Sequence, residues 1–150
     1  MARRVHELMN PDVVCVDPPM AAGVALDLLL ARGVADAPVV SDDGRIIGIV
    51  GQAALVRHVE ARSTMSETGR FFTDDESYRD LGQMTDHRTQ TPVEKIMNTE
   101  IHPVTRETGV AVAANIMRER RLHRLFVTDG GKLVGVITSL DLLRIVEELG

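Results

Sequence analysis

The chain has 150 residues, of which 44% are hydrophobic, 26% are charged and only 3% are aromatic, and its formal net charge is −5. This length and balance suit one globular domain, or two small repeats, with an aliphatic core. The negative charge disfavours nucleic-acid binding, which depends on neutralising phosphates, and the shortage of aromatic residues disfavours stacking on single-stranded bases. No apolar run approaches the roughly 20 residues of a membrane span, and the N-terminus lacks the apolar stretch of a signal peptide, so we expect a cytoplasmic protein.

The residue types that usually carry catalysis or bind metals are scattered along the chain. None of the five histidines stands at metal-ligand spacing from another histidine or from Cys15, the only cysteine, so no metal site is predicted. Cys15 lies in an apolar run, residues 13–16, and is expected to be a small buried side chain. No glycine-rich phosphate-binding motif and no nucleophile with a neighbouring base is recognisable. We therefore expect neither enzymatic activity nor a required cofactor.

The sequence contains an internal repeat. Val5–Asn10 is similar to Val93–Asn98, 88 positions later, and the similarity continues through the residues that follow. Gly44–Val50 is similar to Gly131–Ile137, but at an offset of 87 positions. The second copy has therefore lost one residue, which the sequence comparison places within residues 117–123. The expected organisation is a first copy over residues 1–60, a linker over 61–91 and a second copy over 92–150.

Each copy is predicted to fold as a βαββα unit. In the first copy, helical spacing of Val24, Leu28 and Ala31 predicts a helix over about 21–31, ended by Gly33. The other elements of this copy are expected to be a short strand at 13–16, a strand pair at 38–41 and 46–50, and a last helix from about residue 52.

The second copy is predicted to repeat this order. Val112 and Ile116 indicate a helix over about 109–120, and either Thr138 or Ser139 is a suitable N-cap for the last helix, with Asp141 in its first turn. The expected strands are 101–104, 125–128 and 133–138. Glycine and aspartate in the turns between paired strands are typical of tight hairpins.

The predicted linker differs in composition from both copies. Most of it is polar, as in a solvated loop, but it contains Phe71, Phe72 and Tyr78, most of the aromatic residues of the chain. These aromatic side chains indicate that part of the linker docks on the other copy or on a second chain.

Two segments of the second copy, Leu122–Asp129 and Gly131–Leu142, together resemble the signature of cystathionine-β-synthase (CBS) domains. Ala37–Val40 and Gly44–Val50 resemble it in the first copy, and the resemblance covers nearly the whole chain outside the linker. It implies an α+β fold in which two βαββα repeats pack through their sheets with pseudo-twofold symmetry and form two clefts. Members of the family commonly form homodimers, bind AMP, ADP, ATP or S-adenosylmethionine in such clefts, and regulate an attached or partner protein.

The resemblance also implies that the second copy keeps the ligand-binding side chains. Asp141 matches an aspartate that accepts hydrogen bonds from both ribose hydroxyls, and Thr138 matches a residue that contacts ribose or phosphate. His123 and Arg124 match a pair that contacts phosphate in the family. At an offset of 87, the corresponding residues of the first copy are Ala54, Gly51, Asp36 and Ala37, which cannot make these contacts.

By the geometry of the family, the adenine of this site would pack against the other copy. The apolar residues implicated in this way are Val13, Val14, Val34 and Ala35, and Val136 would add a further apolar wall.

Each polar residue of this set also has a purely structural interpretation. Asp141 is suited to a favourable helix-dipole interaction, Thr138 to capping, and Arg124 to an ion pair with a surface carboxylate. The prediction is a regulatory module that binds one adenine nucleotide, forms a homodimer and modulates an unidentified protein. S-adenosylmethionine suits His123 and Arg124 less well because it has no phosphate. The alternative is a ligand-free module for dimerisation and protein interaction.

Overall fold

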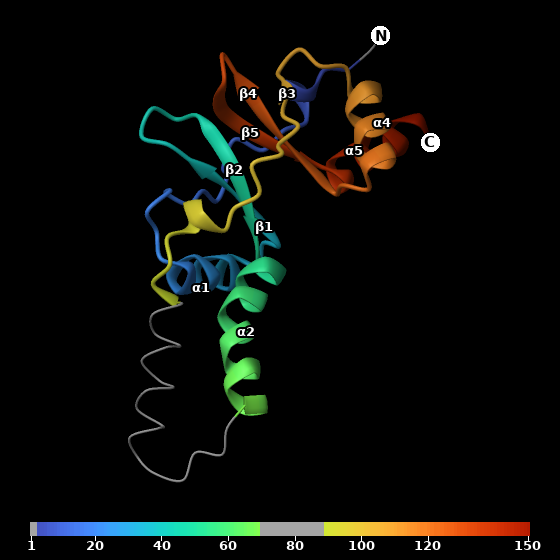
Figure 1. Cartoon of the computed structure of the whole chain (residues 1–150). Helices are drawn as coiled ribbons and strands as arrows, with labels where there is room; N and C mark the ends of the chain where they lie inside the picture. Colours follow the sequence, from blue (N-terminus) through green and yellow to red (C-terminus); the bar gives the residue numbers. More distant parts are fainter. Residues whose placement is uncertain (1–2, 70–88) are drawn as a thin grey trace. The chain divides into compact units, whose positions relative to one another are not determined.

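The computed structural model of the chain describes residues 3–69 and 89–150 (Figure 1). Contacts divide the chain into two compact units. Unit 1 consists of Met1–Val13, Asp42–Ile46 and Glu100–Gly150, and unit 2 consists of Val14–Ser41 and Ile47–Thr99. Both units contain helices and a sheet, so the predicted α+β class is confirmed.

Unit 1 is built on a three-stranded sheet in the order β3-β4-β5. Its strands are β3 (Val104–Thr105), β4 (Arg124–Asp129) and β5 (Lys132–Thr138), and its helices are η1 (Val5–Glu7), α4 (Val110–Arg120) and α5 (Ser139–Leu149). β3 pairs with β4 in parallel, and β4 pairs with β5 as an antiparallel hairpin. In Figure 1, α4 and α5 lie against each other beside this sheet.

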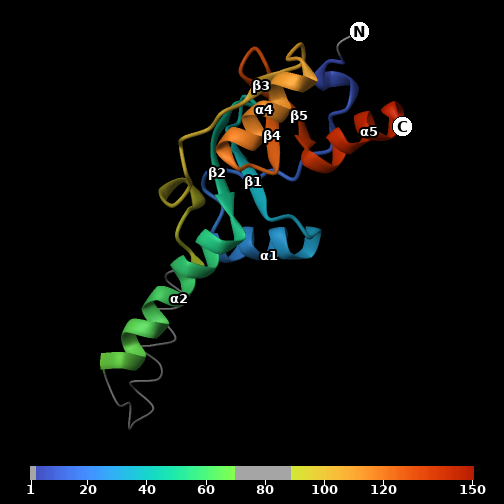
Figure 2. The same cartoon turned by 90° about the vertical axis from the view of Figure 1, so that its right-hand side faces the viewer.

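Unit 2 repeats the arrangement on a smaller sheet. Its strands are β1 (Asp36–Val40) and β2 (Ile46–Gly51), and its helices are α1 (Ala22–Arg32), α2 (Gln52–Gly69) and η2 (Val93–Lys95). The strand predicted at 13–16 is reduced to one parallel bridge between Val16 and Val39, the counterpart of the Val104–Val127 pair in unit 1. Helices α1 and α2 pack against each other (Figure 2). Apart from this first strand of unit 2, the predicted order of elements is confirmed in both copies.

The residues whose spacing predicted α1 do not all lie on its buried face. Val24 is 56% exposed, whereas Ala22, Ala25 and Leu29 are completely buried. In helix α4, Val112 is likewise exposed, and Val110, Ala113 and Met117 are buried. The reason is that apolar residues occupy almost every side of α1, so periodicity alone does not identify the buried side.

The segments that begin the two copies, Val5–Asn10 and Val93–Asn98, are exchanged between them and are called the lead-in segments below. Val5 and Leu8 begin the first copy in sequence but are buried in the core of unit 1, together with Val104, Val110 and Ile137. Val93, the counterpart of Val5, is buried in the core of unit 2. Each core is therefore completed by the segment that begins the other copy.

Backbone hydrogen bonds at equivalent positions also join each lead-in region to the other copy. The N–H of Val110 donates to the carbonyl of Arg3 at 2.9 Å, and the N–H of Ala22 donates to the carbonyl of Thr91 at 2.8 Å. Asn10 exchanges two backbone hydrogen bonds with Val136, as Asn98 does with Ile49. A chain segment that donates and accepts in this way is an integral part of the sheet edge it joins.

The residue missing from the second copy lies in the hairpin turn, which corrects its predicted place within 117–123. Helices α1 and α4 end in left-handed residues 88 positions apart, Gly33 at φ +65° and Arg121 at φ +56°. Two equivalent hydrogen bonds fix the offset on either side of the hairpin: the N–H of Gln52 donates to the carbonyl of Ala35, and the N–H of Ser139 donates to the carbonyl of His123. The acceptors are still 88 positions apart, whereas the donors, which follow the hairpin, are 87 positions apart. The turn of the second copy is therefore the shorter one.

This correction changes the pairs of equivalent residues. Ala35 corresponds to His123, and Asp36 corresponds to Arg124. The sequence analysis had matched His123 with Asp36 and Arg124 with Ala37. The charge difference between the copies is consequently larger than predicted, because a carboxylate in the first copy stands where the second has a guanidinium.

Arg121 is the only non-glycine residue with positive φ among the described residues. A side chain in this conformation is strained, and the first copy has Gly33 at the same position. We expect Arg121→Gly to raise the free energy of unfolding by about 0.5–1 kcal/mol. Arg120→Gly, one residue earlier inside α4, should lower it by about 1 kcal/mol. Urea unfolding measures both, and destabilisation by both variants would contradict the expected relief of strain.

Cys15 is exposed, contrary to the predicted burial of its side chain. Neighbouring residues of an extended segment point to opposite sides, and Val16, 1% exposed, takes the inward position. Partial desolvation and the negative charge of Asp17 raise the pKa of the Cys15 thiol.

The aromatic residues of the predicted linker, Phe71, Phe72 and Tyr78, lie outside the described residues. Helix α2 continues to Gly69, beyond residue 60, where the sequence analysis ended the first copy.

Candidate functional site

Thr138 and Asp141 form the N-terminal cap of α5, as predicted for Thr138. The N–H and the Oγ1 hydroxyl of Thr138 both donate to Oδ2 of Asp141, at 2.8 and 3.0 Å. In return, the N–H of Asp141 donates to Oγ1 of Thr138 at 3.3 Å. This capping box satisfies the first backbone donors of the helix and fixes both side chains at the end of β5. The two contacts of the Asp141 carboxylate both use Oδ2 and leave Oδ1 without a hydrogen bond to any described residue.

His123 and Arg124 are brought to the same end of the sheet. Arg124 is the register partner of Thr138 in the β4–β5 hairpin, and the carbonyl of His123 accepts a hydrogen bond from the N–H of Ser139 at 2.9 Å. His123 is exposed and Arg124 is half-buried, and neither side chain forms a hydrogen bond or ion pair with another described residue. The structure therefore assembles the four polar residues singled out from the sequence around the start of α5.

The apolar residues predicted to contact adenine fall into both units. Val13 and Val136 belong to unit 1, while Val14, Val34 and Ala35 belong to unit 2. Val136 is half-buried and holds Asn10 through two backbone hydrogen bonds. The pairing of Asn10 with Val136 was not predicted from the sequence. The sequence feature that could have indicated it is the Met-Asn pair that ends both Val5–Asn10 and Val93–Asn98.

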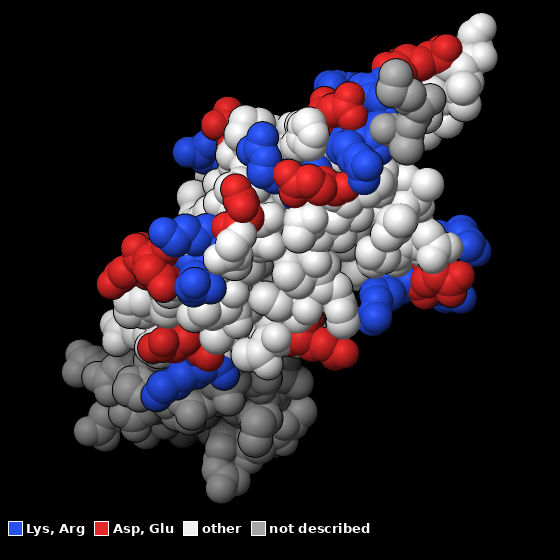
Figure 3. Space-filling view, turned by 90° about the horizontal axis from the view of Figure 1, so that it is seen from above, with Lys and Arg blue, Asp and Glu red and all other residues white. Residues whose placement is uncertain are grey.

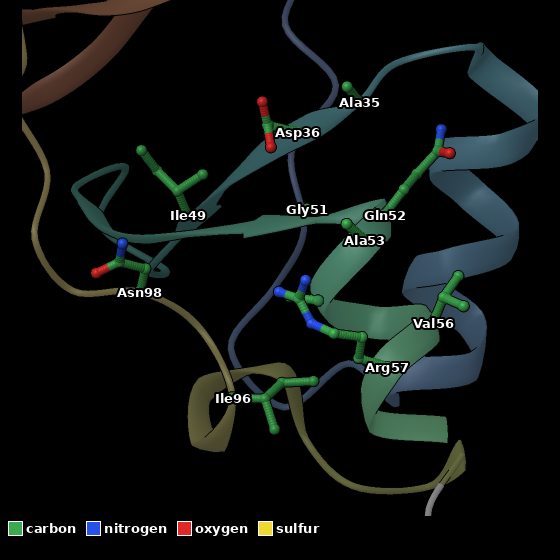
Figure 4. A pocket seen from close by; sticks show the side chains of 11 residues that line it. Ala35, Asp36, Ile49, Gly51, Gln52, Ala53, Val56, Arg57, Ile96 and Asn98 are labelled. Carbon is green, nitrogen blue, oxygen red and sulfur yellow. The ribbon is translucent and has the colours of Figure 1, made fainter. Parts of the chain in front are cut away.

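Unit 2 contains a pocket at the corresponding place in the first copy. Its volume is about 820 Å³, and it is lined by Ala35, Asp36, Ile49, Gly51, Gln52, Ala53, Ala54, Val56, Arg57, Ile96 and Asn98. In Figure 4, Asp36 and Ile49 come from the strands, Arg57 extends from α2, and Ile96 belongs to the exchanged lead-in segment. From the sequence, polar ligand-binding side chains were assigned only to the second copy, and no ligand was predicted for the first.

In the view of Figure 3, Lys and Arg side chains lie beside Asp and Glu side chains, and much of the visible surface between them is uncharged. Within residues 3–69 and 89–150, no group of three or more His, Cys, Asp or Glu side chains could hold a metal ion. No helix in the described part of the chain is long and apolar enough to cross a membrane.

The chain matches the family model of the CBS domain twice, over residues 5–69 and 93–148. It is 25% identical over 145 residues to the A-adding tRNA nucleotidyltransferase of Aquifex aeolicus, covering 97% of this chain but 14% of that protein. The chain spans 32% and 62% of the length of two further curated relatives.

Solved structures share the fold at lower sequence identity. CBSX2 of Arabidopsis thaliana in complex with AMP has a TM-score of 0.72 and 23% identity, covering 97% of each chain. The CBS domain pair of protein MJ0100, solved with 5′-methylthioadenosine and S-adenosylmethionine, has a TM-score of 0.69 and 16% identity over the full length of both chains. Because two family matches cover most of its length, the chain belongs to the CBS-domain family.

Proposed function

We propose that this protein is a regulatory module without catalytic activity that binds an adenine nucleotide at the start of α5 and thereby modulates another protein. Asp141 accepts hydrogen bonds from ribose hydroxyls, Thr138 contacts ribose or phosphate, and His123 and Arg124 contact phosphate. Val136 and Val13 provide apolar surface in unit 1. The AMP complex of CBSX2 supports an adenine nucleotide as the ligand class.

The unused oxygen of Asp141 is the observation that carries this proposal. Capping explains the contacts of Oδ2 with Thr138 but assigns nothing to Oδ1. Oδ1 remains able to accept from a ligand hydroxyl, and the half-buried position strengthens such a charge-assisted bond. Arg124 and His123 can both donate hydrogen bonds to a phosphate, form no hydrogen bond or ion pair with another described residue, and lie at the same end of the sheet.

Calorimetric titration with AMP tests this proposal. Asp141→Asn keeps one oxygen for the cap but loses the charge and the second acceptor, so the affinity should fall about 10- to 150-fold. Asp129→Asn makes the same charge change at the exposed turn end of β4 and should leave the affinity unchanged. Arg124→Gln should weaken AMP binding while leaving adenosine binding intact. Absence of AMP, ADP and ATP binding by the wild type, or unchanged binding by Asp141→Asn, would overturn the proposal.

A second candidate function, a module for dimerisation and protein interaction, is favoured by helix α5. It exposes four apolar side chains at a spacing of three residues, Leu140, Leu143, Val146 and Leu149, between 52% and 82% exposed. Successive members of this series lie about 60° apart around the helix, so Leu143 and Val146 lie side by side at its centre. Arg144 and Glu147 lie next to them in sequence and have no ion-pair partner among the described residues. An antiparallel contact between two α5 helices would cover Leu143 and Val146 and place opposite charges together, so we propose a homodimer through α5.

Sedimentation measurements test the proposed homodimer. Leu143→Asp should convert the dimer to a monomer, because the interface would bury an unpaired carboxylate. Arg144→Glu and Glu147→Arg should each weaken association, and the double variant should restore it because the opposite charges face each other again. A wild type that is monomeric, or a double variant weaker than both single variants, would exclude this interface.

A further inference from the structure

The pocket of unit 2 occupies the same place in its copy as the proposed nucleotide site does in the other. Its lining residues Ala35, Gly51 and Ala54 correspond to His123, Thr138 and Asp141, at the offsets that the hydrogen bonds establish. Three polar side chains are therefore replaced by hydrogen or methyl groups, which leaves the space of about 820 Å³. Such a volume is typical of small-molecule sites.

The polar groups that remain differ in charge from those of the second copy. Asp36 takes the position of Arg124, and its half-buried carboxylate forms no hydrogen bond or ion pair with another described residue. It lies directly over Gly51, where an added Cβ would come within 2.6 Å of Oδ1 of Asp36. A phosphate would be repelled here, whereas a cationic group would be attracted.

Arg57 is the second charged side chain in the pocket that has no ion-pair partner among the described residues. It extends from α2 between Asp36 and Ile96 in the view of Figure 4 and forms no ion pair with a described residue. Ile49, Val56 and Ile96 supply apolar surface beside these two charges. A ligand with both an ammonium and a carboxylate group would neutralise the pair, and an apolar substituent would fill the remaining space.

We propose that this pocket binds a small zwitterion of the amino-acid type, with its ammonium group at Asp36, its carboxylate at Arg57 and an apolar side chain against Ile49 and Ile96. The proposal is independent of the nucleotide site, because none of these four residues belongs to it. A purely structural role for Asp36 is a favourable interaction with the start of α2. That role predicts a change in stability on mutation but no selectivity among ligands.

Three matched probes separate the contributions of the two charges. Phenylalanine carries both charges, 2-phenylethylamine only the cation and 3-phenylpropionate only the anion. In ¹H–¹⁵N NMR titrations, phenylalanine should cause saturable shifts at the amides of Ile49 and Gln52, and 3-phenylpropionate should bind at least about tenfold more weakly. 2-Phenylethylamine should bind with intermediate affinity.

Variants assign each charge to its residue. Asp36→Asn should lower the affinity for phenylalanine and 2-phenylethylamine at least about tenfold, and Arg57→Gln should reduce phenylalanine to the level of 2-phenylethylamine. Asp27→Asn, an exposed carboxylate on α1 outside the pocket, should change neither. Equal binding of 3-phenylpropionate, no saturable shift with phenylalanine, or unchanged binding by Asp36→Asn would overturn the proposal. Loss of AMP binding in Asp141→Asn concerns only the nucleotide site, so the two proposals can fail separately.

Discussion

Replacement of Leu29 by alanine should lower the free energy of unfolding by about 2–5 kcal/mol, as is typical when a completely buried leucine leaves a cavity. Leu29 is 0% exposed in the core of unit 2, where it packs with Val16, Val39 and Leu55. Because folded domains are stable by only about 5–15 kcal/mol, this one change removes a substantial fraction of the total. Urea unfolding monitored by circular dichroism measures the loss.

Leu30 provides an unusually close control for this prediction. It is the next residue of the same helix and the same residue type, but its side chain is 57% exposed. Leu30→Ala should therefore change the free energy of unfolding by less than about 0.5 kcal/mol. Similar losses for both variants would contradict the assignment of the buried face of α1.

Val5→Asp should destabilise the protein by more than about 4 kcal/mol, because it buries a carboxylate without a partner. The location of the effect follows from the exchanged lead-in segments. Val5 begins the first copy, but its neighbours in the core are Val104, Val110 and Ile137 of the second copy. Amide hydrogen exchange should therefore accelerate first in β4 and α4, and less in β1 and α1.

His6→Asp is the matched control, since His6 is the next residue of η1 and is exposed. It should leave exchange rates in β4 close to those of the wild type. A milder pair, Val5→Ala and Val93→Ala, should show opposite localisation, with Val93→Ala affecting β1 and α1 because Val93 is buried in the core of unit 2. Faster amide hydrogen exchange in β1 after Val5→Ala would contradict the placement of Val5 in the core of unit 1.

Much of the fold could be predicted because its signals are local. The left-handed end of α1 requires a residue such as glycine, and Gly33 is there. The cap of α5 depends on Thr138 and Asp141, three residues apart in sequence. The order of elements could be predicted from two similar segments in one chain, because both have turn residues at corresponding positions between the predicted strands.

The candidate site was predictable to the same extent. Thr138, Asp141, His123 and Arg124 lie on two strands and a helix start that are joined by a short hairpin, so their proximity follows from the hairpin register. The pairing with the first copy was not predictable in detail. Alignment could place the missing residue in several positions, and only hydrogen bonds in both copies located it in the turn.

The sequence by itself determined that this protein is a duplicated βαββα chain of the CBS type and that the four polar residues of the candidate site all belong to the second copy. These features depend on residue order and short-range spacing, which are visible without coordinates. Only the tertiary structure decided which face of α1 is buried and which copy each lead-in segment completes. It also showed that Asp36, beside the pocket of unit 2, is the counterpart of Arg124 and has the opposite charge. These features depend on long-range contacts, and similar apolar segments can satisfy either of two nearly identical cores until packing selects one.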